Sequence, residues 1–162
     1  MGLTDEQIKD LIEERKRVPK DFLKKLVAKP KNHRKHTEAE LMVKGDKGHK
    51  FILAAHKHVD NPKSFSVMLR YMDEKQNKQY ILMRCNGSSH RHTNTIEKET
   101  TSGCHIHVAT KRYFDMGDVT SGFAYATEEY SSYSGAMDTL IKLCNFQVGE
   151  TKRLDDYWEM ER

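Results

Sequence analysis

The feature that most limits the fold of this chain is the alternation of apolar and polar residues in its middle part. Phe65, Val67, Leu69 and Tyr71 recur at every second position, and runs with the same period occupy residues 51–56 and 80–85. Alternate side chains of a strand point to opposite faces of a sheet, so a period of two predicts β-strands. Turn-forming residues at 45–48 and 73–78 separate the runs, which indicates an antiparallel meander.

Helical spacing is confined to the two ends of the chain. Thr4 and Gln7 fit a capping box, and the apolar residues after them predict a helix over residues 5–17. Pro19 and Pro30 bracket a second predicted helix. Ser134 is expected to begin a third helix, whose apolar stripe covers one face of the sheet.

Strands grouped between terminal helices predict an α+β fold, with two N-terminal helices, an antiparallel sheet and a C-terminal helix packed on the sheet. A chain of 162 residues falls in the size range of one domain. We therefore expect a single domain over residues 1–162. Its parts are a helical segment at 1–30, the sheet at 37–130 with a long loop at 88–103, and the C-terminal helix at 134–146.

Composition and cysteine use favour a cytoplasmic protein. No segment approaches the roughly 20 apolar residues that a membrane span needs, and the N-terminus lacks the pattern of a secretory signal. The three cysteines are odd in number and widely spaced, which is typical of reduced thiols or metal ligands. We expect no contact with a membrane.

Two His-x-His pairs carry the most distinctive chemistry of the sequence. On a strand, the two histidines of a pair share a face, and the segment between the pairs is long for a hairpin loop. Four imidazoles, or three imidazoles and a thiolate, satisfy a tetrahedral Zn²⁺ ion. The sequence therefore predicts a structural zinc site, with His90, His105, His107, His92 and Cys144 as its candidate ligands.

The same residues allow other interpretations. The histidines could be surface groups, and Cys144, on the apolar stripe of its predicted helix, is typical of a small core residue. Cys104 neighbours His105 on the predicted strand and should face away from it. A metal-dependent nuclease or hydrolase would need a carboxylate near an open coordination position. No Asp or Glu has a diagnostic spacing, so no catalytic residue is predicted.

Positive charge is concentrated between residues 15 and 35, where ten Lys or Arg residues face only one acidic residue, Asp21. Such asymmetry predicts a face that attracts an anionic partner, either nucleic acid or an acidic protein surface. A solvated helix face and a basic linker are the alternative. The candidate partner-binding residues are Arg15, Lys16, Arg17, Lys20, Lys24, Lys25, Lys31, Arg34 and Lys35.

Three short segments, at Asn86–His90, Gly103–His107 and Leu143–Phe146, resemble an uncharacterised domain family of bacteria and their phages. That family has no assigned activity, so the resemblance implies no enzyme. It implies a setting of mobile elements and host defence, in which zinc-containing anti-CRISPR proteins block Cas9.

We therefore expect a zinc-binding, non-enzymatic inhibitor of a host protein or ribonucleoprotein, such as a Cas9-type effector, that acts in the bacterial cytoplasm. A metal-dependent nuclease or hydrolase is one alternative. A nucleic-acid-binding protein that acts through residues 15–35 is the other.

Overall fold

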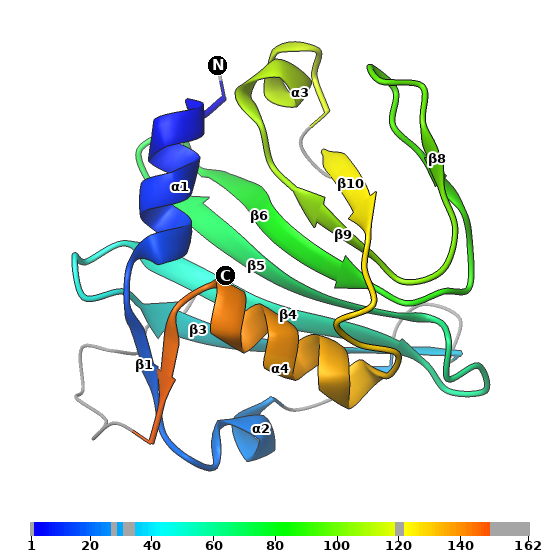
Figure 1. Cartoon of the computed structure of the whole chain (residues 1–162). Coiled ribbons are helices and arrows are strands. Elements are labelled where there is room, and N and C mark those ends of the chain that lie inside the picture. Colours follow the sequence, from blue (N-terminus) through cyan, green and yellow to red (C-terminus); the bar gives the residue numbers. More distant parts are fainter. Residues whose placement is uncertain (1, 27–28, 31–34, 119–121, 150–162) are drawn as a thin grey trace.

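The middle of the chain forms a seven-stranded sheet in a computed structural model that describes residues 2–26, 29–30, 35–118 and 122–149. The strand order is β10-β9-β6-β5-β4-β3-β2, and every neighbouring pair is antiparallel (Figure 1). The predicted α+β class and antiparallel meander are confirmed. The strands are β2 (Lys29–Pro30), β3 (His36–Lys44), β4 (Lys50–His58), β5 (Phe65–Asp73), β6 (Lys78–Asn86), β9 (His105–Val108) and β10 (Phe123–Ala126).

The N-terminal helices are shorter than the sequence predicts. Helix α1 (Asp5–Glu13) begins at the expected capping box, where the Thr4 hydroxyl accepts a hydrogen bond from the Gln7 amide. It does not reach residue 17, because β1 (Lys16–Val18) pairs in parallel with β11 (Phe146–Val148). Helix α2 (Phe22–Lys25) is a single turn, so only part of the predicted second helix forms.

The C-terminal helix α4 (Tyr133–Leu143) packs on β5 and β6, as the sequence predicts. Its N-cap is Ser132, two residues before the expected one, because the Ser132 hydroxyl accepts from the Gly135 amide. The helix ends before residue 146, since Asn145 takes a positive φ of 56° and leads the chain into β11. A further short helix, α3 (Lys111–Asp115), replaces the end of the expected strand after His105.

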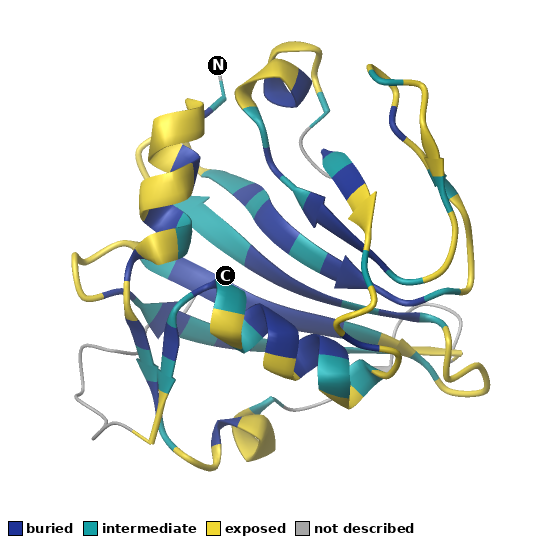
Figure 2. Ribbon diagram, viewed as in Figure 1, coloured by how far each residue is buried: buried dark blue, intermediate teal, exposed yellow. Residues whose placement is uncertain are grey.

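The two faces of the sheet differ in what covers them. Helices α1 and α4 lie on the same face, and their apolar residues share one core with the strands (Figures 1 and 2). We call this the covered face. A smaller cluster of Ile52, Ala54 and Met68 lies on the opposite, second face. Because β4 is buried on both faces, its residues 51–55 are all buried.

The predicted loop at 88–103 contains a small hairpin, formed by β7 (His92–Thr93) and β8 (Thr100–Thr101). Asn94 ties this hairpin to strand β10: its side-chain amide donates to the Ala124 carbonyl and accepts from the Ala124 amide, both at 2.8 Å. The hairpin is therefore held beside the β9–β10 edge of the sheet. In the part of the chain that the structure describes, no helix is long and apolar enough to cross a membrane.

Candidate functional site

The four imidazole rings of the two His-x-His pairs form one cluster. Strand β9 directs His105 and His107 to the second face, while Ile106 between them enters the main core. Both histidines are buried. The segment after β6 brings His90 and His92 over them. The ring centres of His92 and His107 are 4.6 Å apart, and those of His105 and His107 are 5.0 Å apart. The His105 ring lies 5.4 Å from the His90 ring and 6.0 Å from the His92 ring.

Hydrogen bonds orient the two buried rings toward one point. The Gly103 carbonyl can only accept, so the His105 Nδ1 atom 2.9 Å away carries the ring proton. The lone pair of His105 Nε2 then faces the Asn86 amide nitrogen at 3.5 Å, and His107 Nε2 faces the same nitrogen at 3.3 Å. The Ser66 hydroxyl donates to the Asn86 Oδ1 atom at 2.8 Å. Two imidazole nitrogens therefore converge on one amide group, which is itself oriented by a serine.

The electrostatics of the cluster favour neutral imidazole. Burial lowers the pKa of His105 below its ordinary value, and the nearby His90, His92 and Arg84 act in the same direction, against the Gly103 carbonyl. His105 is therefore neutral at pH 7. Neutral imidazole is also the form that binds metal ions.

The four histidines of the cluster are not positioned to coordinate one metal ion. Among the described residues, no group of three or more His, Cys, Asp or Glu side chains is placed to hold an ion. The His92 Nε2 atom is engaged with the Asn94 side chain at 3.2 Å. Rotation of rings about their side-chain bonds would therefore be needed before the four histidines could share one ion.

Cys144 does not join the histidines. It is fully buried in the core of the covered face, and its thiol lies 3.8 Å from the Met83 sulfur. Burial raises the pKa of the Cys144 thiol to about 12, so the thiolate that binds metal is absent at neutral pH. Burial also raises the pKa of Cys104, which packs against the same core. Cys144 therefore serves as a small core residue rather than a zinc ligand.

Lys16, predicted to contact a partner, is fully buried. Its ammonium group donates to the carbonyls of Leu11, Ile12 and Glu14 at the end of α1, at 3.1, 3.0 and 2.7 Å. It also donates to the Cys144 carbonyl at the end of α4, at 2.8 Å. Burial lowers the pKa of Lys16 to about 8, although the nearby Cys144 and Glu14 act against this. Lys16 thus joins two helix ends and is not available to a partner.

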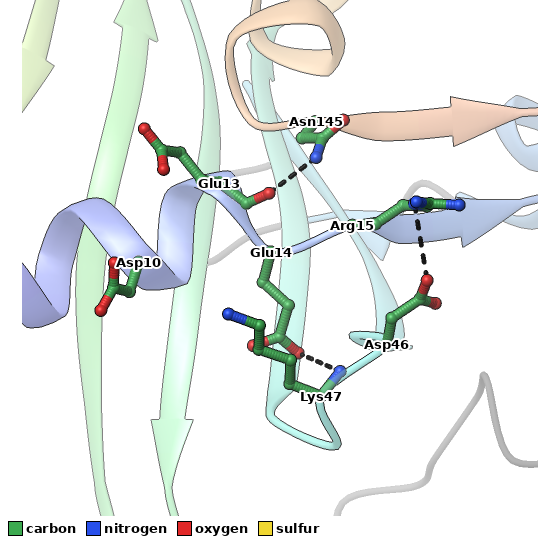
Figure 3. A pocket seen from close by; sticks show the side chains of 7 residues that line it. All are labelled: Asp10, Glu13, Glu14, Arg15, Asp46, Lys47 and Asn145. Carbon is green, nitrogen blue, oxygen red and sulfur yellow. Dashed lines mark hydrogen bonds and ion pairs between the residues drawn. The ribbon is translucent and has the colours of Figure 1, made fainter.

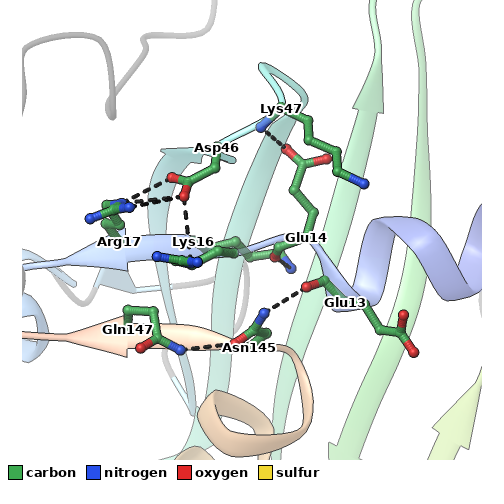
Figure 4. A network of polar contacts seen from close by, with 9 residues as sticks. Glu13, Glu14, Lys16, Arg17, Asp46, Lys47, Asn145 and Gln147 are labelled. Atoms are coloured by element: carbon green, nitrogen blue, oxygen red, sulfur yellow. Dashed lines mark hydrogen bonds and ion pairs between the residues drawn. The ribbon is translucent and has the colours of Figure 1, made fainter.

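The neighbouring arginines are engaged with one carboxylate. Arg15 and Arg17 lie 3.5 and 3.1 Å from Asp46, in the turn between β3 and β4 (Figures 3 and 4). Glu14 also contacts this turn, because its carboxylate accepts a hydrogen bond from the Lys47 backbone amide. Other predicted partner-binding residues are exposed, namely Lys20, Lys24, Lys25 and Lys35. Lys31 and Arg34 lie outside the described residues.

Comparison with known protein families shows which family the chain belongs to. A model for a family of unknown function, DUF6978, matches residues 3–147. The chain belongs to this family. No curated protein and no solved structure matches it.

The match spans both His-x-His pairs, the basic residues from Arg15 and the Cys144 position, so every predicted site residue lies within the DUF6978 domain. The expected membership of an uncharacterised domain family is confirmed. A phage setting and a Cas9-type target stay predictions.

The polar residues that surround the histidines in this DUF6978 domain were not predicted from the sequence. Asn86 and Arg84 lie on β6 opposite His105 and His107 of β9. Asn86 lies in the first of the three motif segments, where no role was predicted for it, and no role was predicted for Arg84 either. The signal that would have found both is the alternation of β6, because Arg84 and Asn86 occupy the same phase of the strand.

Proposed function

We propose that this DUF6978 protein is a zinc-binding, non-enzymatic binding protein, in which the four-histidine cluster holds the ion. The zinc would join the segment that carries His90 and His92 to strand β9, which carries His105 and His107. Its role would be structural, since it would fix the β7–β8 hairpin region against the second face of the sheet. The proposal changes the predicted ligand set by leaving out Cys144.

The spacing of the four rings is the observation that supports this proposal. Imidazoles bound to one tetrahedral Zn²⁺ through nitrogen at about 2.0 Å have ring centres roughly 5 Å apart. Four of the six ring-centre distances in the cluster range from 4.6 to 6.0 Å. These four distances are close to those of a tetrahedral site, so ring rotation would turn nitrogens of these rings toward a common centre.

Asn86 explains how the cluster is stable without an ion. Its amide nitrogen faces the His105 and His107 Nε2 atoms, and so occupies the place of a cation between two lone pairs. If the Asn86 amide turns over, it presents oxygen to that place, and its nitrogen can donate to the Ser66 hydroxyl. A zinc ion bound by the four imidazoles would therefore displace the Asn86 amide nitrogen from between the two lone pairs.

Elemental analysis of the purified, untagged protein tests the proposal. We expect about one equivalent of zinc per chain, and its loss in His105→Ala and in His90→Ala. His90 is exposed, so the His90→Ala variant folds even if removal of a buried ring does not permit folding. His36→Ala is the matched control, because His36 is also exposed but lies on β3 beside His58.

A second measurement replaces zinc with Co²⁺, whose visible absorption bands report tetrahedral coordination. We expect these bands in the wild type and in His36→Ala, with altered bands in His90→Ala. Zinc at background level, together with a melting temperature that does not change on addition of EDTA, would contradict the proposal.

The partner of the protein stays a proposal that rests on sequence resemblance. It is a host protein or ribonucleoprotein, such as a Cas9-type effector, whose activity this protein would inhibit. The metal-dependent hydrolase alternative makes a different prediction, because metal exchange would then change a rate of phosphodiester or ester cleavage while the fold persists. Nucleic-acid binding through residues 15–35 is less favoured, since Lys16 is buried and Arg15 and Arg17 pair with Asp46.

A further inference from the structure

A groove crosses the second face of the sheet beside the histidine cluster. It has a volume of about 380 Å³, which falls in the size range of small-molecule sites. It extends from His36 of β3, across β4, β5 and β6, to Ser89 and His90. Three Lys or Arg side chains and four histidines line it, and none of the described residues that line it is acidic. The groove is therefore lined by cationic and neutral polar side chains without a carboxylate among them, which suits an anion better than a cation.

The three cations of the groove are not equally engaged within the protein. Arg70 donates to the Glu40 carboxylate at 2.6 Å and lies 3.6 Å from Glu38. The Lys57 ammonium lies 4.3 Å from the centre of the Tyr133 ring of α4, so its charge is directed to the covered face and away from the groove. The Nε atom of Arg84, in contrast, is enclosed and has no hydrogen-bond partner in the part of the chain that the structure describes.

An enclosed guanidinium nitrogen without a hydrogen-bond partner is costly. Burial lowers the pKa of Arg84, and the nearby Asp118 carboxylate acts in the opposite direction. Arg84 lies on β6, opposite Met68 of β5 and His107 of β9, and so at the middle of the second face. Its planar fork matches two oxygens of a phosphate or carboxylate. Phosphate suits this fork best, because it is the anion with more charge and more oxygens.

We infer that this groove binds a phosphate group, with Arg84 as the residue that grips it. The ligand class is a nucleotide or the backbone of a nucleic acid, both of which present that group. Asn86 and Ser66, which line the groove next to Arg84, supply neutral polar groups beside the anion. The inference does not depend on zinc, because none of its steps uses the histidine cluster as a metal site.

Binding measured with three phosphate probes tests the inference. Calorimetric titrations would use inorganic phosphate, adenosine monophosphate and a single-stranded DNA 12-mer of mixed sequence, all in EDTA so that no metal contributes. We expect at least one of the three to bind the wild-type protein. Binding of the mononucleotide as tight as that of the 12-mer would identify a nucleotide site, whereas tighter binding of the 12-mer would identify a nucleic-acid backbone site.

Matched variants separate the groove from the N-terminal basic segment. Arg84→Gln should weaken binding by about tenfold, and Arg84→Lys should restore little of it, since lysine keeps the charge but not the fork. Lys24→Gln removes the same charge from an exposed position of α2 and should leave the affinity unchanged. Melting temperatures of all variants report whether they fold.

Three outcomes would overturn the inference. The first is that none of the probes binds the wild type. The second is an equal loss of affinity in Lys24→Gln and Arg84→Gln, which would place binding outside the groove. The third is that sodium acetate competes with phosphate at the same concentration, which would show that the site does not distinguish phosphate from a carboxylate.

Discussion

The two faces of the seven-stranded sheet surround a basic side chain in different ways: Lys16 is fully buried, whereas Arg84 is half-buried with an enclosed Nε atom. On the covered face, the three N–H groups of the Lys16 ammonium are shared among four backbone carbonyls at the ends of α1 and α4. On the second face, the Arg84 Nε atom has no partner among the described residues. The hydrogen bonds of Lys16 are made within the fold and join two helix ends, whereas the incomplete hydrogen bonding of Arg84 is the reason that we infer a ligand beside it.

The comparison also explains why the two residues occur where they do. Lys16 follows directly on the end of α1, where carbonyls without helical partners need donors. The Phe51 ring, 4.5 Å from the ammonium, completes its surroundings. Arg84 lies in mid-strand, where backbone groups already bond to β5 and β9. Its guanidinium group must therefore find an acceptor elsewhere.

Substitution of Lys16 should have the largest effect. Lys16→Met keeps an apolar stem but leaves four carbonyls without their donor, so we expect the free energy of unfolding at pH 7 to fall by about 3 kcal/mol. Lys24→Met, at an exposed position of α2, should change it by less than about 0.5 kcal/mol. Urea titrations followed by circular dichroism measure both values. A loss below about 1 kcal/mol in Lys16→Met would contradict a stabilising role for Lys16.

The pH dependence of stability should show the cost of burying Lys16. Its pKa is about 8 in the folded protein and near 10.5 when unfolded, so the unfolded chain binds more protons between these values. Stability from this residue therefore rises with pH over that window, by about 2 kcal/mol from pH 7.5 to 9.5. Urea titrations at both pH values would compare the wild type with Lys16→Met, which lacks the group.

The difference in unfolding free energy between wild type and Lys16→Met should therefore grow with pH. A difference that stays constant would mean that the four carbonyls offset the burial of the charge completely. The pKa of Lys16 would then be close to its ordinary value.

The sequence predicted the sheet well because a period of two depends on local residues alone. It predicted the shared faces of His105 and His107 for the same reason. It did not predict the end of α1, because the strand pairing of Lys16–Val18 with Phe146–Val148 joins segments about 130 residues apart. Such a contact leaves no local pattern.

The histidines of the candidate site were predicted from the sequence, but the residues around them were not. Ten basic residues between 15 and 35 suggested a binding face, but composition cannot show that Asp46 pairs with Arg15 and Arg17. Nor can it show that Lys16 is enclosed. The groove on the second face draws Lys57, Arg70 and Arg84 from three different strands, and only the register of the sheet brings them together.

Substitution of Arg84 should have the smallest effect on stability, which completes the comparison with Lys16. In Arg84→Met, no hydrogen bond of the Nε atom is lost and an enclosed polar atom is removed, so the free energy of unfolding should change by less than about 0.5 kcal/mol or should increase. The same variant should lose phosphate binding. Urea titration beside Lys16→Met measures the first effect, and calorimetry measures the second. A loss of stability as large as that of Lys16→Met would show that Arg84 is held by the fold, and the contrast between the two faces would fail.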